Sequence, residues 1–172
     1  MTGPMELQLI VMFGLLGTLV VAGVSDAARY IIPNSVVLAL VGLFLVAAPF
    51  APNSLAWPSH IGAGVAVFAV GCLLFQFRLM GGGDVKLWAA CALWTGLDLL
   101  LTQVVYVTLI GVTLALALVL IRAAFERVAR LLGGRARLVL PRLLREGEAV
   151  PYGVAIAAGS ILLAGEISSK FA

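Results

Sequence analysis

The chain has 172 residues, of which 63% are hydrophobic and 11% charged, and its formal net charge is +3. Soluble domains carry about half apolar and about a quarter charged residues, so this composition excludes an ordinary soluble protein. The long uncharged segments predict membrane-spanning helices, each of which needs about 20 apolar residues. A transmembrane β-barrel is disfavoured because the apolar runs are continuous rather than alternating.

The apolar segments predict an all-α, polytopic transmembrane helical bundle that forms a single domain over residues 1–172. In chain order, six spans are expected, at about residues 6–25, 34–51, 60–79, 84–95, 97–122 and 150–169. Pro33 precedes the second span, which suits a helix start. The fourth span is short, so we expect it to be tilted or to cross incompletely. The N-terminal apolar run lacks a basic region before it, and we interpret it as a retained helix rather than a signal peptide.

Basic residues predict the topology of these spans, because cytoplasmic loops of membrane proteins are rich in Lys and Arg. Placing the first, third and fifth loops inside puts ten of the eleven Lys and Arg residues in the cytoplasm. Both termini then lie outside. The fifth loop, at about 123–149, mixes arginines with leucines. It is expected to be either an amphipathic segment on the anionic inner leaflet or a solvated connection.

Two acidic residues, Asp26 and Asp84, stand out because ionisable residues beside membrane spans are costly and by default suggest function. The topology places both at the cytoplasmic edge, at the ends of different helices. Two carboxylates held close together share a proton, so that one acts as a base and the other as an acid. Such a pair can activate water and protonate a leaving amine.

Three glycines, Gly81, Gly82 and Gly83, precede Asp84. Glycine allows close approach of another chain, so an extended peptide could pair with this backbone. The same residues are also typical of a flexible turn in which Asp84 caps the following helix. The glycine run alone does not separate the two interpretations.

The residues around the two aspartates resemble a known family. Gly83-Asp84-Val85-Lys86-Leu87 resembles the GxGD segment of type IV prepilin peptidases. Asp26, Arg29 and the run Ile32-Pro33-Asn34 resemble that family's first aspartate motif, and Pro151-Tyr152-Gly153 resembles a third, weaker one.

This resemblance implies a metal-free aspartic endopeptidase of the prokaryotic inner membrane, with Asp26 and Asp84 as the catalytic pair and no cofactor. The implied substrates are prepilins and pseudopilins, whose leader would be cleaved at the cytoplasmic face. Supporting or substrate-binding roles are expected for seven flanking residues, namely Gly81, Gly82, Gly83, Lys86, Arg29, Pro33 and Asn34.

The chain departs from the large members of that family in one respect. Those members carry paired CxxC motifs and methylate the new N-terminus, whereas this chain has two cysteines, Cys72 and Cys91, and no CxxC. It therefore resembles the short form found in tight-adherence (Flp) pilus systems. We expect leader cleavage without N-methylation, and no zinc site.

Two other classes of function stay open at the level of sequence. A small proton- or cation-coupled transporter also uses intramembrane carboxylates, although near the middle of the bilayer. A non-catalytic component of a pilus assembly machine would use the aspartates only as helix caps. Lys86 and Arg29 can equally be markers of topology. No nucleic-acid partner is expected.

Overall fold

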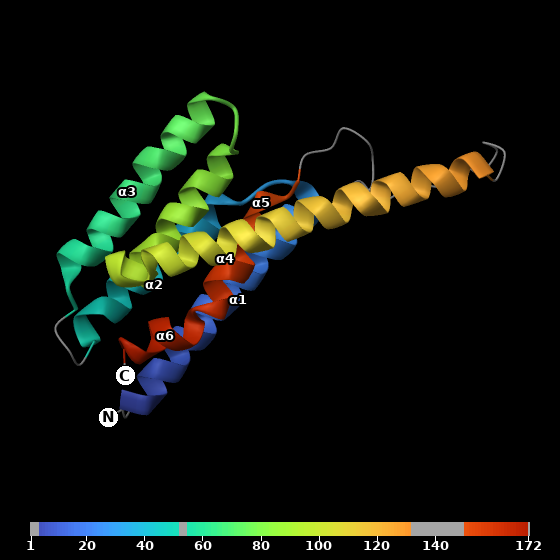
Figure 1. The fold of residues 1–172 in the computed structure, drawn as a ribbon. Helices are drawn as coiled ribbons and strands as arrows, with labels where there is room; N and C mark the ends of the chain where they lie inside the picture. Colours follow the sequence, from blue (N-terminus) through green and yellow to red (C-terminus); the bar gives the residue numbers. More distant parts are fainter. Residues whose placement is uncertain (1–3, 52–54, 132–149, 172) are drawn as a thin grey trace.

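The structure is a computed structural model, and it describes residues 4–51, 55–131 and 150–171. These residues contain helices and connecting turns but no strand (Figure 1). The helices are α1 (Pro4–Arg29), α2 (Asn34–Ala47), the short 3₁₀ helix η1 (Ala48–Phe50), α3 (Trp57–Gln76), α4 (Gly82–Leu131), α5 (Tyr152–Leu162) and α6 (Ala164–Ser169). The predicted all-α helical bundle is confirmed.

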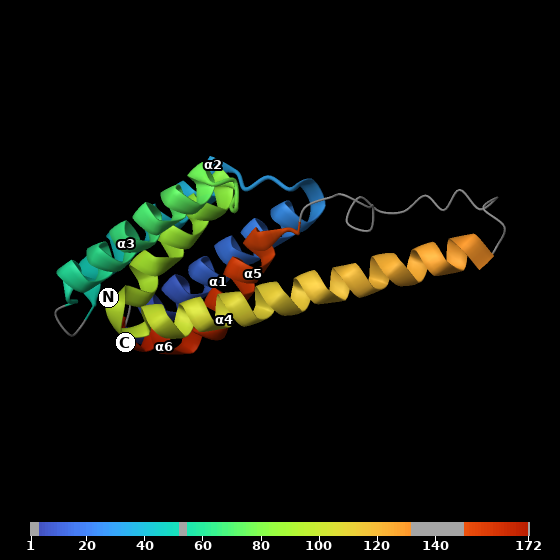
Figure 2. The ribbon, with the colours of Figure 1, turned by 45° about the horizontal axis from the view of Figure 1, so that its top comes forward.

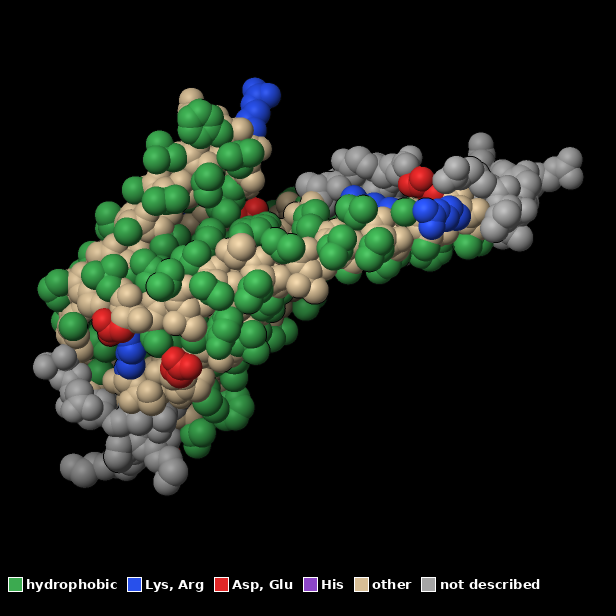
Figure 3. Space-filling model, in the orientation of Figure 1, with side chains coloured by type: hydrophobic (Ala, Val, Ile, Leu, Met, Phe, Trp, Pro, Cys, Tyr) green, Lys and Arg blue, Asp and Glu red, His purple; other side chains and the backbone are tan. Residues whose placement is uncertain are grey.

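The surface of the bundle suits a lipid environment. Hydrophobic side chains cover most of the face seen in Figure 3. Helix segments Leu9–Arg29, Trp57–Gln76 and Gly82–Val128 are long and apolar enough to cross a membrane, and Asn34–Phe50 and Tyr152–Leu162 are shorter apolar helices. The protein is therefore a membrane protein, whereas its number of crossings stays a prediction.

Helix α4 is broken at Gly96, whose φ of 66° and ψ of 178° are not helical. This backbone conformation is essentially restricted to glycine. The first part of α4 lies beside α3, and after Gly96 the chain changes direction and extends well beyond the bundle (Figures 1 and 2). The break expected between the predicted spans at about 84–95 and 97–122 therefore lies at Gly96.

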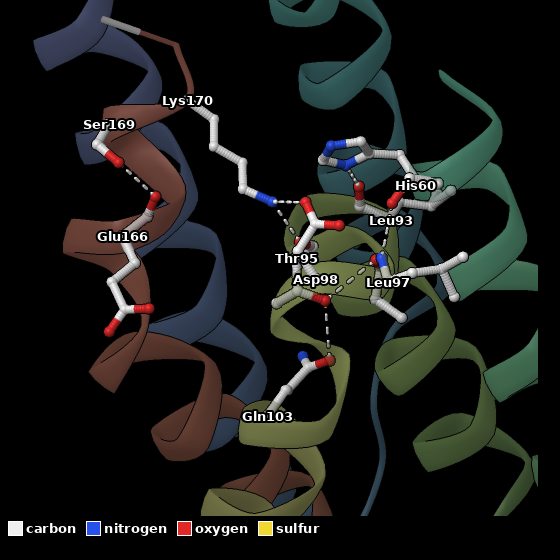
Figure 4. Close-up of polar contacts among 11 residues, drawn as sticks. His60, Leu93, Thr95, Leu97, Asp98, Gln103, Glu166, Ser169 and Lys170 are labelled. Atoms are coloured by element: carbon white, nitrogen blue, oxygen red, sulfur yellow. Dashed lines mark hydrogen bonds and ion pairs between the residues drawn. The ribbon is translucent and has the colours of Figure 1, made fainter. Parts of the chain in front are cut away.

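Polar contacts fix the turn at Gly96 (Figure 4). The ammonium group of Lys170 donates to the Thr95 carbonyl at 2.7 Å and pairs with the Asp98 carboxylate at 3.2 Å. The Leu97 amide donates to the Ser59 hydroxyl at 3.0 Å. The C-terminal segment and the start of α3 are thereby joined to the middle of α4.

The first helix is longer than the sequence predicted. We expected a loop from Asp26, but α1 continues to Arg29, so that Asp26 lies in its last turn. The Tyr30 amide donates to the Asp26 carbonyl at 2.8 Å, and Tyr30 has a φ of 55°. The hydroxyl of Ser25 donates to the Ile31 carbonyl at 2.8 Å. These local hydrogen bonds extend α1 beyond Ser25, where the hydropathy of the sequence has already fallen.

Two other predicted boundaries also differ. The predicted fifth span ends near residue 122, but α4 continues through Leu131 and so includes the start of the predicted basic loop. The remainder of that loop, 132–149, lies outside the described residues. The predicted sixth span is divided into α5 and α6 at Leu163.

The packing of the helices brings three helix ends together. Helix α3 packs mainly on α4, α5 packs on α4 and α1, and α2 packs on α1 and α4. The buried Trp94 side chain joins α4 to α2, because its indole N–H donates to the Leu40 carbonyl at 3.1 Å and its ring contacts Phe44. The end of α1 and the starts of α4 and α5 gather at one end of the bundle, away from the N and C labels (Figures 1 and 2).

Candidate active site

The carboxylate of Asp26 contacts the first turn of α5. Its side chain is 5% exposed, and its Oδ2 atom accepts a hydrogen bond from the Val154 backbone amide at 3.2 Å. The first amides of a helix have no partner within the helix, and the helix dipole favours a negative charge there. The Asp26 side chain on α1 thus caps the N-terminus of α5, which begins more than a hundred residues later in the chain.

Asp84 lies in the first turn of α4, two residues after the helix begins at Gly82. The turn before it is glycine for a steric reason, because a Cβ on Gly81 would lie 2.9 Å from the Asp84 Oδ2 atom. The Gly81 backbone is also a hydrogen-bond partner of this carboxylate. Asp84 is only partly buried, so part of this residue is accessible at the N-terminal end of α4.

Gly153 connects the two carboxylates. Its backbone is within hydrogen-bonding reach of both Asp26 and Asp84, and the charges of the two aspartates interact electrostatically. A Cβ on Gly153 would lie 2.8 Å from the Asp26 Oδ2 atom and 2.7 Å from the Ile32 Cδ1 atom. Glycine at the second position of α5 therefore leaves room for the Asp26 carboxylate and the Ile32 side chain.

Both aspartates line one pocket of about 860 Å³. The described residues that line it come from the ends of α1 and α3, the turn after α3, and the starts of α4 and α5: Asp26, Tyr30, Phe75, Gln76, Arg78, Leu79, Met80, Gly81, Asp84, Val150 and Tyr152. The pocket combines two carboxylates with a wall of mixed apolar, aromatic and polar side chains, Arg78 among them. Such an arrangement can hold an extended peptide while an acid and a base act on one bond.

The other residues singled out in the sequence lie around the pocket rather than in its lining. Gly82 packs against the Phe75 ring, and Gly83 packs against Ile32. Lys86 donates to the Asn34 side-chain oxygen at 3.2 Å and so joins α4 to α2. These contacts support the helices that carry the aspartates.

Two further residues from the first motif also lie outside the described lining. Pro33 is extended, with a ψ of 137°, and stands at the N-cap position immediately before α2 rather than within its first turn. Arg29 is exposed at the end of α1. Of the nine predicted site residues, the pocket lining brings together Asp26, Asp84 and Gly81.

Several residues of the site were not among the nine predicted site residues. Ile32 is buried between Gly83 and Gly153, and so packs against the start of α4, which carries Asp84, and the start of α5, which contacts Asp26. Tyr30 and Arg78 line the pocket, and both have positive φ angles, of 55° and 57° respectively. Sequence periodicity carries no signal for such backbone conformations.

Tyr152 could have been recognised from its motif. It follows Pro151 at the start of α5 and lines the pocket, and its ring lies 6.2 Å from that of Trp88, one turn after Asp84. A Cβ on Gly111 would lie 2.9 Å from the Tyr152 ring, so α4 provides a close-fitting surface for it. The third motif is therefore part of the pocket wall.

Comparison with known proteins identifies the family of the chain. The sequence profile of the type IV leader peptidase family matches residues 13–120, more than half of the chain. The chain belongs to the type IV leader peptidase family. The matched range contains both Asp26 and Asp84. No curated protein and no solved structure matches the chain.

Membership of this leader peptidase family makes the protein a peptidase and gives its substrates in general terms as prepilin-type proteins. The resemblance predicted from the aspartate motifs is confirmed. The Pro151-Tyr152-Gly153 motif lies beyond the matched range, and its Tyr152 lines the same pocket.

Proposed function

We propose that this leader peptidase is an aspartic endopeptidase that uses Asp26 and Asp84 as its catalytic pair. The observation that supports the proposal is their common position. Carboxylates from two helices line one pocket and share the Gly153 backbone as a partner. A pair that shares its surroundings in this way is suited to hold one proton between two carboxyl groups.

In the proposed reaction, the ionised aspartate removes a proton from a water molecule, whose oxygen attacks the scissile carbonyl carbon. The protonated aspartate donates its proton to the carbonyl oxygen, giving a neutral tetrahedral intermediate. As the C–N bond then breaks, the protonated aspartate gives its proton to the leaving nitrogen, and the ionised aspartate takes a proton from a hydroxyl group of the intermediate, so that the leader is released with a new carboxyl group. The pair returns to its starting state with one proton.

The proposed substrates are prepilins and pseudopilins of a tight-adherence (Flp) type system, cleaved after their basic leader without N-methylation. The proposed place is the cytoplasmic face of the inner membrane, with both termini outside. Support comes from the basic residues: Arg29 and Arg78 lie next to the pocket end of the bundle, as the excess of Lys and Arg in cytoplasmic loops requires.

The positions of the acids disfavour the transporter hypothesis. A transporter needs its carboxylates near the middle of the bilayer, beside broken helices. Asp26 instead lies in the last turn of α1, and Asp84 lies in the first turn of α4. The break in α4 occurs at Gly96, which packs against His60 and Ser59 rather than against an aspartate of the pair.

A cleavage assay with separate asparagine variants tests the proposal. Asp26→Asn keeps a side-chain oxygen that can accept the hydrogen bond from the Val154 amide. Asn and Asp cap helices about equally well. The substitution removes only the carboxyl group needed for acid–base chemistry. We expect Asp26→Asn and Asp84→Asn each to lower kcat on a purified prepilin by at least about a hundredfold, the usual range for a lost acid or base.

The matched control is Asp98→Asn, which changes an exposed acid at the Gly96 turn. It should cleave at the wild-type rate. If both pocket variants still cleave the prepilin normally, the aspartates serve only as structural caps and the proposed function is wrong.

A further inference from the structure

A second hollow lies on the other side of the first part of α4. It is a groove of about 350 Å³, and its lining comes from three helices. The described residues that line it are Val37 and Val41 of α2, Ile61, Gly64, Val65 and Phe68 of α3, and Lys86, Ala89, Ala90 and Leu93 of α4. We call it the lateral groove. It is separate from the aspartate pocket and shares no lining residue with it.

The groove arises from the way in which α2 and α3 are packed. Both helices pack on α4 rather than extensively on each other, so a furrow remains between them. Small residues keep it open: a Cβ on Gly64 would lie 2.8 Å from the Leu93 Cδ2 atom, and Ala89 and Ala90 face it from α4. Its outer edges include Val65 and Phe68, which are exposed at 62% and 47% and so face lipid in a membrane.

The groove is apolar along its length and charged at one end. Among the described residues in its lining, Lys86 carries the only charge. Its ammonium group lies beside Asn34 at the start of α2. Because an ammonium has three N–H donors, the hydrogen bond to Asn34 leaves two of them for another acceptor. Helical periodicity then places Ala89, Ala90 and Leu93 progressively further from this charged end.

This combination matches the chemistry of an anionic phospholipid. An acyl chain fits a narrow apolar furrow open to the bilayer, and a phosphate fits a cation with free donors at its mouth. A cation near the surface attracts anionic lipid, and the attraction falls off over short distances. We propose that the lateral groove binds one anionic phospholipid, with its headgroup at Lys86 and an acyl chain between α2 and α3.

The site would have a consequence for the peptidase. Lys86 is two residues from Asp84, and on a helix such neighbours point to different faces. A lipid held at Lys86 would therefore contact the same helical turn as Asp84 from the opposite side, and it would join α2, α3 and α4 at the end where the aspartates lie.

Native mass spectrometry of the full-length protein, with dioleoyl phosphatidylglycerol or dioleoyl phosphatidylcholine added to the detergent, tests the proposal. We expect one phosphatidylglycerol to bind about fivefold more tightly than phosphatidylcholine, the preference expected for one cation beside an anionic headgroup. Lys86→Gln should abolish this preference. Arg29→Gln removes a charge from the end of α1, outside the groove lining, and should retain it.

Ala89→Leu provides a second variant that leaves the charge in place. It should fill part of the groove and lower binding of both lipids severalfold. Melting temperatures close to wild type will show that each variant is folded. Equal binding of the two lipids, or equal effects of Lys86→Gln and Arg29→Gln, would overturn the proposal. The proposal would also be overturned if the wild-type protein formed a dimer that Ala89→Leu dissociates while lipid binding stays unchanged. A second copy of the chain, rather than a lipid, would then occupy the groove.

Discussion

Gly153 lies against the carboxylate of Asp26 so closely that a Cβ at this position would be 2.8 Å from Oδ2 and 2.9 Å from Cγ. The two residues come from α5 and α1, and the neighbouring Val154 amide binds the same carboxylate. The start of α5 therefore acts as a fixed support for one member of the proposed catalytic pair. It limits where Asp26 can lie relative to Asp84.

Gly153→Ala should lower leader cleavage while the protein remains folded. A Cβ nearer than 3.0 Å to the carboxylate forces Asp26 or Ile32 to move, and a displacement of about 1 Å in a catalytic group can reduce the rate about a hundredfold. We expect a decrease in kcat/KM of at least about tenfold. Gly17→Ala, on α1 with open space around it, is the matched control and should keep wild-type activity.

Ile32→Ala should reduce both stability and activity. Ile32 is 8% exposed and packs against Gly83 and Gly153, so truncation would leave a cavity between the starts of α4 and α5. We expect a loss on the order of 2 kcal/mol in the free energy of unfolding, as for other Ile→Ala changes in a core. The neighbouring Ile31 is 63% exposed, and Ile31→Ala should change neither the melting temperature nor the cleavage rate appreciably. Equal effects of the two variants would contradict this role of Ile32.

Gly96→Ala should destabilise the fold more than it affects catalysis. Gly96 has φ 66° and ψ 178°, and a Cβ would lie 3.2 Å from the His60 ring and the Ser59 hydroxyl. A non-glycine residue in this region costs about 1–3 kcal/mol. The melting temperature should fall, while the folded fraction retains cleavage because the turn lies at the far end of the first part of α4. Gly42→Ala, with nothing within 4 Å, should not lower the melting temperature.

Lys170→Ala should destabilise the protein more than Asp98→Asn. Both changes remove the exposed ion pair, which is worth at most about 1 kcal/mol. Only Lys170→Ala also removes the donor to the Thr95 carbonyl, which belongs to a fully buried residue. A buried acceptor left without its partner costs about 1–3 kcal/mol. Thermal unfolding of both variants in the same detergent measures the difference, and equal melting temperatures would show that the Thr95 contact contributes nothing.

The sequence predicted some boundaries well and others poorly, for identifiable reasons. The turn near Gly96 was predictable because glycine and polar residues interrupt two apolar runs. The end of α1 was placed too early because hydropathy falls at Asp26, whereas the helix is continued by backbone hydrogen bonds that hydropathy does not represent. The loop predicted from residue 122 was likewise too early, because charged residues such as Arg127 are compatible with a helix that extends beyond the bundle.

The sequence by itself determined the helical membrane architecture, the family, and the two aspartates as the candidate pair. Hydrophobic composition and local motifs carry that information, because both depend on residues that are near neighbours in the chain. Only the tertiary structure decided how the pair is supported: Val154 and Gly153 contact Asp26, Ile32 lies between Gly83 and Gly153, and Lys86 binds Asn34 and lines the lateral groove. These contacts join residues far apart in the chain, and they exist only once the helices have packed.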